Sequence, residues 1–434
     1  MSVFSKLGTG VAIFAASALV LSGCAAAEDA PAPETTDETG GTSMPAETLQ
    51  LKVGTILPQT GTLAYLGPPE EAGVALAVED INAANAGIEI DVVYGDSGDL
   101  DNKAFETDVP RILNEGVSAI IGAASSGVSL QFIDQVTKEA GVVMFSPANT
   151  STRFSDYDDD GLYFRTAPAD FLQGEALGTL LARDGHQTVA MIVLNDAYGL
   201  TLRDEATKAF EAAGGEVVAT PSVNQGDTNL TSQIREALDA QPDAIVVILF
   251  DETKTAVPEL VANRFPADRL YFTDGNTANY GTDDFPAGLF QGAKGLIPGP
   301  TSEDVASDFK ERADAVWQAM GNPSLFDAND WAYSTESYDA TILIALAALA
   351  AGSTESRAIA DKLVEVSGGS GNGTKCTSFA ECAEIINGGG VADYDGLSGP
   401  VTFGPNGDPT QAQVGIYEYD ENNNPQPIDS VRNF

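Results

Sequence analysis

A stretch from Val117 to Val136 combines an apolar run, a turn of small and hydroxyl residues, and a helical pattern. Its sequence is VSAIIGAASSGVSLQFIDQV, and Ser125 and Ser126 stand where the helix should begin. The first turn of a helix has backbone N–H groups without intrahelical partners, and the helix dipole adds partial positive charge at that end. Such a turn suits a small anion such as a carboxylate. We therefore predict an anion-binding turn at Ser125 and Ser126.

Polar side chains also follow other runs that we expect to be strands. In open α/β sheets, ligands bind outside the carboxyl ends of the strands, so these positions should surround one site. Donors at Ser126 and Thr150 could hold a carboxylate, and an acid such as Asp274 could pair with an ammonium group. Each residue alone could equally be a helix cap or a turn residue, but their repetition at successive strand ends predicts a site for a zwitterion. The further polar strand ends carry Ala148, Asn149, Thr150, Asn195 to Tyr198, Asp251 and Asp274.

The sequence offers little for catalysis. His186 is the one histidine, and it stands in a predicted turn between a helix and a strand. The motifs of α/β-hydrolases, zinc proteases, P-loop NTPases and dinucleotide-binding proteins are missing. The acidic run from Asp156 to Asp160 lacks the ligand spacing of an EF-hand loop, and we interpret it as a solvated loop. We therefore predict no enzymatic activity, no cofactor and no metal.

The elements that would position these residues alternate regularly from Leu49 onward. Short β-rich runs alternate with helical ones, and runs such as AIVVILF are apolar throughout, as are strands buried on both faces of a parallel sheet. This pattern predicts an α/β fold of doubly wound parallel-sheet lobes. The expected strands lie near 51–56, 88–94, 117–121, 142–146, 189–194, 216–221, 244–250 and 270–273. The expected helices lie near 69–85, 101–115, 127–139, 170–183, 198–213, 228–240 and 253–264.

A proline within one predicted helix and a looser order toward the C-terminal end depart from this regular alternation. Pro110 should kink or break the second helix early, because proline cannot donate the helical hydrogen bond. Toward the C-terminal end the alternation loosens into three expected helices, followed by two short strands around a turn. The apolar segment TILIALAALAA is too short to cross a membrane and should be a buried helix. These helices are expected near 302–320, 329–351 and 357–366, and the strands at 400–403 and 413–419.

The N-terminal residues indicate export. Residues 1–23 place one cation, Lys6, before a short apolar run, which is the pattern of a signal peptide. The ending Leu-Ser-Gly before Cys24 resembles a bacterial lipobox, in which Cys24 would be lipid-modified; the alternative is an ordinary signal peptide with an incidental cysteine. Residues 24–48 are rich in Pro, Thr, Gly and acids and should form a flexible tether.

Net charge narrows the range of partners. The chain has 21 Lys and Arg against 64 Asp and Glu, which gives a formal net charge of −43. Removal of residues 1–23 would take away Lys6 and leave −44. A field this negative argues against nucleic acid and against an anionic membrane surface as partners. Adaptation to high salt would produce the same bias, so it does not require a cationic ligand.

Two further cysteines, Cys376 and Cys382, lie in a Gly/Ser/Asn-rich segment. Outside the cytoplasm such a pair should form a disulfide that closes a short surface loop. Without a nearby histidine the pair does not complete a zinc site.

A series of short motifs recurs in a definite order. The motifs are Gly67-x-x-Glu70-x-x-Gly73, Ala77 to Asn82, Tyr94-Gly95-Asp96, Ile121 to Ser126, Phe145 to Thr150, Phe164-Arg165-Thr166, Ala197-Tyr198-Gly199 and Phe272 to Gly275. From Leu49 to the C-terminus, this order resembles the Leu/Ile/Val-binding type of periplasmic solute-binding protein, the receptor component of ABC importers of amino acids. The collective order is more specific than any single motif.

This resemblance implies an architecture that periodicity alone does not predict. Two lobes would be joined by three hinge crossovers, with the ligand held in the cleft between them, as in the type I periplasmic binding protein fold. The first lobe would comprise residues 49–166 and 298–398, and the second 167–297 and 399–434.

The resemblance also implies how the ligand is held at its carboxylate end. Ser126 and Thr150 would bind the α-carboxylate, helped by the backbone at Ala148 and by the helix that begins after Ser126. Ser125 and Asn149 would stand beside them as further binding residues.

At the opposite end, Tyr198 and Asp274 would face the α-ammonium, and Tyr65 would lie near the ligand side chain. The sequence departs from the family around Asp251, where a tyrosine is expected, and Asp274 aligns only after a one-residue shift. A second acid at Asp251 would favour a polar or cationic solute over leucine, unless that side chain faces solvent.

The function implied is that of an extracytoplasmic, monomeric lipoprotein, anchored through Cys24 to the outer face of the cell membrane or the periplasmic side. It would bind an amino acid, branched-chain or a related small zwitterion, and deliver it to an ABC permease. The alternative is a ligand-sensing receptor of the same fold for amides, urea or other small polar solutes. A lipoprotein enzyme is disfavoured because the sequence lacks a base and a metal set.

Overall fold

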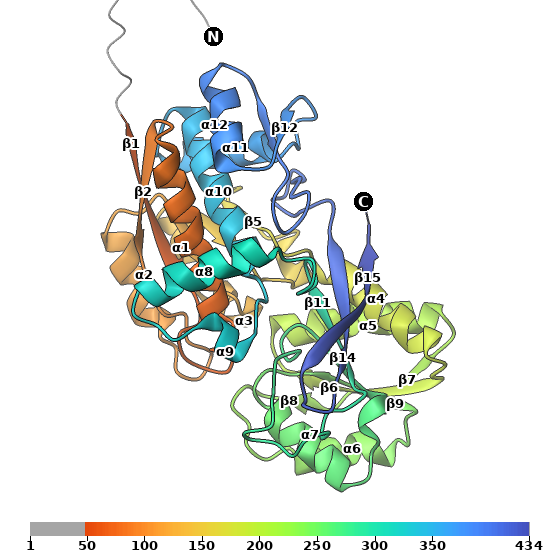
Figure 1. Cartoon of the computed structure of the whole chain (residues 1–434). Coiled ribbons are helices and arrows are strands. Elements are labelled where there is room, and N and C mark those ends of the chain that lie inside the picture. Colours follow the sequence, from red (N-terminus) through yellow and green to blue (C-terminus); the bar gives the residue numbers. More distant parts are fainter. Residues whose placement is uncertain (1–47, 434) are drawn as a thin grey trace, which may run out of the picture. The chain divides into compact units, whose positions relative to one another are not determined.

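The computed structural model describes residues 48–433, whose longer strands form two separate sheets (Figure 1). The first sheet is entirely parallel, with the strand order β2-β1-β3-β4-β5. Its central strands are buried throughout, as expected when helices cover both faces. The strands are β1 (Leu49–Ile56), β2 (Ile88–Val93), β3 (Ala119–Gly122), β4 (Val143–Ser146) and β5 (Tyr163–Arg165).

Separate apolar clusters form on the two faces of this sheet. One face carries α2 (Phe105–Asn114) and α3 (Ser126–Asp134), which continues into the π-helix η1 (Gln135–Glu139). The other carries helices of which α1 (Gly67–Ala84) and α10 (Ser334–Ala351) pack most extensively on each other. A Cβ atom at position 73 would collide with the carbonyl oxygen of Ser334, so the motif glycine Gly73 allows this close approach.

The remaining helices of this face are α8 (Ser307–Ala319), α11 (Ser356–Val366) and α12 (Phe379–Asn387), with the short α9 (Leu325–Ala328) beside α8. A small parallel sheet of β12 (Thr374–Cys376) and β13 (Ala392–Tyr394) packs with α12. We call the five-stranded sheet with all these elements the five-stranded half.

The second sheet has the strand order β15-β14-β11-β10-β9-β6-β7, with β8 paired to β6. Helices α4 (Asp170–Arg183) and α5 (Ala197–Ala212) pack together on one side of it, and α6 (Thr231–Asp239) and α7 (Thr253–Ala262) on the other (Figure 1). We call this sheet with these helices the eight-stranded half. Its strands are β6 (Thr188–Leu194), β7 (Glu216–Ala219), β8 (Ser222–Val223), β9 (Ala244–Ile248), β10 (Leu270–Phe272), β11 (Lys294–Pro298), β14 (Gln413–Tyr419) and β15 (Pro425–Arg432).

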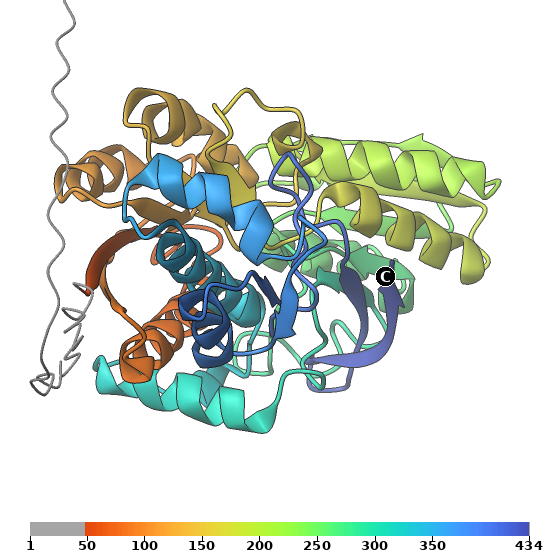
Figure 2. The same cartoon turned by 90° about the horizontal axis from the view of Figure 1, so that it is seen from above.

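Both halves repeat one doubly wound pattern. The parallel strands β7, β6, β9, β10 and β11 follow the same order, second-first-third-fourth-fifth, as the five strands of the first sheet. The chain crosses between the halves after β5, after β11 and after β13. In Figure 2 the blue helices between the second and third crossovers lie with the orange elements of the first sheet. The C-terminal strands, which follow the third crossover, lie beside the green elements of the second sheet. The predicted α/β fold with doubly wound parallel sheets is confirmed.

Several local predictions are wrong. Residues 400–403 form no strand, since only Phe403 makes an isolated bridge, to Pro409. Helix α2 continues through Pro110 to Asn114, so of the kink or early break predicted at Pro110 the early break does not occur. The helix expected from residue 329 begins at Ser334, after Tyr333 with a φ of 59°. The unpredicted strand β15 contains two prolines, which its place at the edge of the sheet tolerates because only one side pairs.

Two predictions concern the cysteines and possible membrane spans. The Cys376–Cys382 disulfide is present and is confirmed. The predicted signal peptide of residues 1–23, Cys24 and nearly all of the tether lie outside the described residues.

Within residues 48–433, no single helix is long and apolar enough to span a membrane; α10 and α11 meet that criterion only as a pair bent by 107°. Residues 334–348 of α10 are buried, as predicted for that segment.

Candidate functional site

A small cavity lies where strand ends from both halves meet. Its volume is about 20 Å³, room for about one water molecule, so a larger ligand requires the lining to move apart. The lining loops follow β1, β3 and β4 of one half and β6, β9 and β10 of the other. The cavity is lined by Leu63, Leu66, Ala124, Ser125, Ser126, Ala148, Tyr198, Phe250, Asp274, Gly275 and Tyr333. We call it the interlobe cavity.

The predicted anion-binding turn lies on one wall. Ser125 is the N-cap of α3 and accepts a hydrogen bond from the backbone N–H of Val128 at 3.3 Å. The hydroxyl of Ser126 accepts one from the N–H of Ser151 at 3.3 Å. Thr150 is buried nearby; its carbonyl oxygen accepts from the N–H of Asp170 at 2.7 Å, and its side chain lies beside the Asp170 carboxyl. This wall therefore offers a helix start and hydroxyl groups, all of them uncharged.

Asp274 lies on the opposite wall and is only 6% exposed. Its carboxylate accepts hydrogen bonds from Gln173 Nε2 at 2.9 Å, Tyr198 OH at 2.8 Å and Tyr333 OH at 2.7 Å. Burial raises the pKa of the Asp274 carboxyl, although these hydrogen bonds act in the opposite direction. Tyr65 donates to its backbone oxygen at 3.0 Å. The donors are all neutral, so this acid lacks a positively charged partner in the cavity lining.

A second buried acid lies behind this wall. Asp170, in the first turn of α4, accepts a hydrogen bond from Thr201 Oγ1 at 2.9 Å. Burial, together with the charge of Asp274, raises the pKa of Asp170 to about 8. The eight-stranded side of the site is therefore acidic.

Tyr198 is fixed by several contacts. Its hydroxyl shares a hydrogen bond of 2.6 Å with Thr273 Oγ1 and accepts another from the N–H of Gly275 at 3.2 Å. Its ring stacks on Phe250 with the centroids 5.4 Å apart. Tyr198 therefore holds Asp274 in place and forms part of the wall.

Tyr65 and Asp251 line a neighbouring cavity of about 120 Å³, which shares Phe250 and Gly275 with the interlobe cavity. Asp251 pairs with Lys254 at 2.5 Å, and both side chains are about half exposed. Four aromatic residues line this cavity together with the charged residues Asp251, Lys254 and Asp284, and we call it the aromatic chamber. Its aromatic residues are Tyr65, Phe250, Tyr280 and Phe285.

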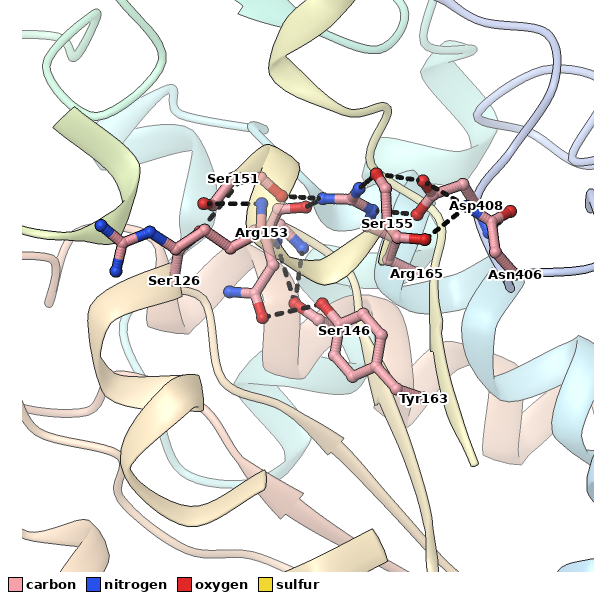
Figure 3. A network of polar contacts seen from close by, with 11 residues as sticks. Ser126, Ser146, Ser151, Arg153, Ser155, Tyr163, Arg165, Asn406 and Asp408 are labelled. Atoms are coloured by element: carbon pink, nitrogen blue, oxygen red, sulfur yellow. Dashed lines mark hydrogen bonds and ion pairs between the residues drawn. The ribbon is translucent and has the colours of Figure 1, made fainter. Parts of the chain in front are cut away.

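The loop that carries Thr150 is held from behind by Arg165, which is fully buried (Figure 3). Its guanidinium donates to the carbonyl oxygens of Asn149 at 3.0 Å and Ser151 at 2.9 Å, and to Asp408 Oδ1 at 2.6 Å. Since Asp408 lies on the third crossover between the halves, one ion pair ties the binding loop to that crossover.

Asn149 faces the interior of the five-stranded half. Its amide donates to the carbonyl oxygens of Ala123 at 2.9 Å and Ala124 at 2.7 Å, and its Oδ1 accepts from Tyr163 at 3.0 Å. These contacts join the loops after β3 and β4, so Asn149 shapes the turn from behind.

The structure thus brings together five of the predicted residues in one cavity and leaves four around it. Ser125, Ser126, Ala148, Tyr198 and Asp274 line the interlobe cavity; Tyr65 and Asp251 line the aromatic chamber, and Asn149 and Thr150 lie buried behind the wall. Sequence reasoning missed Gln173 and Tyr333, which no motif marks. Within residues 48–433, no group of three His, Cys, Asp or Glu side chains could hold a metal.

Comparisons with known proteins identify the family of this chain. The sequence model of a family described as Periplasmic binding protein matches residues 50–424. The leucine-, isoleucine-, valine-, threonine-, and alanine-binding protein of Pseudomonas aeruginosa is 30% identical over 196 residues, 44% of this chain and 51% of that protein. The chemotactic signal transduction system substrate-binding protein BasB of Halobacterium salinarum is 24% identical over 360 residues, 80% of this chain and 82% of that protein.

The fold comparison agrees. The crystal structure of the leucine binding protein LivK of Thermotoga maritima has a TM-score of 0.68 at 20% identity, over 88% of this chain and 98% of that chain. The relatives named are binding proteins rather than enzymes, and the chain spans about half the length of the first of them.

Proposed function

Since this chain belongs to the periplasmic binding protein family, we propose that it binds an amino acid as a zwitterion between its two halves and delivers it to an ABC permease. The observation that carries the proposal is Asp274. A buried carboxylate with neutral donors only is costly, and a ligand ammonium would supply the missing counter-charge. No Lys, Arg or His lines the interlobe cavity, so a positive charge facing Asp274 would come from the ligand.

The ligand carboxylate would bind at the opposite wall. The N-terminus of α3 and the hydroxyl of Ser126 offer uncharged donors there. Thr150 would add its hydroxyl, which lies beside the buried Asp170 carboxyl. Acid on one wall and donors on the other match the separation of charge in an α-amino acid.

The ligand side chain would extend toward the aromatic chamber. The chamber shares Phe250 and Gly275 with the interlobe cavity, and its rings favour an apolar or aromatic side chain. Asp251 is paired with Lys254 at the half-exposed rim, so in this proposal it contacts only the far end of a long side chain.

Closure would move the two halves as lobes. We place the first lobe at residues 49–166 and 298–398 and the second at 167–297 and 399–434, with hinges at the three crossovers. Because the site is built from both halves, separation of the lobes would open it and closure would exclude water and strengthen the charge pairing.

Membership in a periplasmic family places the protein outside the cytoplasm. The anchoring is part of the proposal: residues 1–23 as a signal peptide, Cys24 as the lipidated residue and residues 24–48 as a tether, with the protein acting as a monomer at the cell surface. The lipobox-like sequence before Cys24 supports this.

A second candidate is a sensor for amides, urea or other small polar solutes. A relative that matches 80% of the chain is described as belonging to a chemotactic signal transduction system. Uptake of labelled ligand by cells lacking this protein distinguishes the two roles: loss of uptake supports transport, and unchanged uptake with loss of a behavioural response supports sensing.

The binding claim is tested by thermal unfolding with a panel of amino acids, amides, urea and short carboxylates. A ligand that binds only the folded state at about 100 times its Kd stabilises by about 2.7 kcal/mol, so the unfolding midpoint should rise with particular amino acids. No shift with any amino acid would contradict the proposal, and shifts with amides or urea alone would favour the second candidate.

A further inference from the structure

The side chain of Gln225 bridges the two halves outside the binding cavity. It lies on the loop between β8 and α6, in the eight-stranded half, and is half-buried. Its Nε2 donates to Thr62 Oγ1 at 2.6 Å, and its Oε1 accepts from the backbone N–H of Leu100 at 2.9 Å. Both polar groups of the Gln225 side-chain amide are therefore hydrogen-bonded to the five-stranded half.

The receiving surface on the five-stranded half is fixed by Asp99, which is 5% exposed. One carboxylate oxygen accepts from the N–H of Thr62 at 3.0 Å, and the other accepts from the N–H groups of Asp101 at 2.9 Å and Asn102 at 2.8 Å. The loop of Thr62 and the loop of Leu100 thus form one preorganised surface. Thr62 directly precedes Leu63, which lines the interlobe cavity.

The loop that carries Gln225 is tied to the opposite wall of the cavity. The N–H of Gly226 donates to Glu252 Oε1 at 2.7 Å, and Glu252 Oε2 accepts from the N–H of Phe250 at 3.2 Å. Glu252 is buried, and Phe250 lines both the interlobe cavity and the aromatic chamber. The contact of Gln225 is therefore connected to a cavity wall in each half.

We propose that Gln225, Thr62 and Leu100 form a closing latch, in which Gln225 is a positioning residue that holds the halves together over the ligand without touching it. The inference rests on the proposed function. Opening the site breaks both hydrogen bonds of Gln225, whereas a ligand can enter before they form. The latch therefore slows release of the ligand and leaves its capture nearly unchanged.

The test compares Gln225→Ala with the wild-type chain, using the amino acid that gives the largest thermal shift and stopped-flow measurement of both rate constants. Loss of two neutral hydrogen bonds should raise Kd by about tenfold. The increase should lie in the dissociation rate, with the association rate within about twofold. The unfolding midpoint of the ligand-free protein should fall only slightly, because only the closed fraction of the ligand-free molecules holds the latch. Gln233→Ala is the matched control, because Gln233 hydrogen-bonds only within its own half: it donates to the carbonyl oxygen of Ser222 and accepts from Ser232 Oγ.

A double-mutant cycle distinguishes a latch from a structural effect. Thr62→Val should speed release in the wild-type background and have no further effect in the Gln225→Ala background, because the partner is already gone. Additive effects, or an unchanged dissociation rate in Gln225→Ala, would overturn the latch.

If no amino acid binds the wild-type chain, the proposed function fails and the latch remains measurable. Small-angle scattering of the ligand-free proteins should then show a larger radius of gyration for Gln225→Ala than for the wild type and Gln233→Ala. Identical scattering of all three proteins would overturn the latch.

Discussion

Asp274 is the one acidic side chain that lines the interlobe cavity, and no basic side chain lines it. It is buried against three neutral donors, and its partners come from α4, from α5 and from the residue before α10. A carboxylate in such surroundings gains most from a partner that carries positive charge. Asp251 differs because it is half exposed and already paired with Lys254.

Asp274→Asn should therefore weaken amino-acid binding by about 100-fold, since it removes the charge that pairs with the ammonium while keeping the size of the side chain. Asp251→Asn is the matched control and should change affinity by less than about threefold, as expected for an exposed ion pair. Calorimetric titration of both variants with the same amino acid measures the difference. Comparable losses in the two variants would mean that both acids contact the ligand.

Part of this site was predictable from the sequence and part was not. Ser126, Tyr198 and Asp274 follow expected strands, and the ends of parallel strands must meet at one edge. Tyr333 and Gln173 complete the shell around Asp274 from helix starts distant in the sequence. The Gln173 contact lies within the eight-stranded half, whereas the Tyr333 contact arises only when the two halves come together.

At the scale of elements, the buried parallel strands were the most predictable part of the fold. Apolar runs such as that of β9 match strands covered on both faces. The region before α10 shows where local sequence fails. Tyr333 adopts a φ of 59°, which interrupts the expected helix, and at this break its hydroxyl reaches Asp274. Tertiary contacts such as this hydrogen bond decide the conformation of Tyr333, and helix propensity alone does not predict it.

The loop that carries Thr150 is held in place by a buried charged side chain. Arg165 joins the loop of Thr150 to the third crossover through Asp408. The sequence contains the arginine within a motif but gives no sign that its partner lies 243 residues further along the chain.

At the scale of the whole molecule, the three crossovers followed only from the family resemblance, because periodicity says nothing about which sheet a strand joins. The molecule also carries a formal net charge of −43, and several of its acids are buried. Burial raises the pKa of Asp170 and Glu336 to about 8 and that of Glu71 and Asp196 to about 7.

These raised values predict that the ligand-free protein becomes less stable as pH rises. An acid with a higher pKa in the folded than in the unfolded state binds more protons when folded. Its contribution to stability is full below the unfolded pKa of about 4 and is lost as pH rises through about 7 to 8. Unfolding midpoints at constant ionic strength should therefore fall between about pH 5 and pH 9.

Glu336→Gln provides the control for this prediction. Glu336 is 3% exposed and accepts a hydrogen bond from Thr335 at 2.9 Å, so removing its charge should flatten the pH profile. A midpoint that rises with pH, or a slope unchanged in the variant, would contradict the assignment.

The central claim is that each end of the ligand carries one charge and each wall of the site recognises one of them. The most direct measurement is calorimetric titration of the wild-type chain with its best amino acid, with the corresponding hydroxy acid, and with the corresponding amide. The account predicts that both analogues bind about 100-fold more weakly, because each leaves one wall without its partner. A hydroxy acid that binds as tightly as the amino acid would show that Asp274 does not recognise an ammonium group.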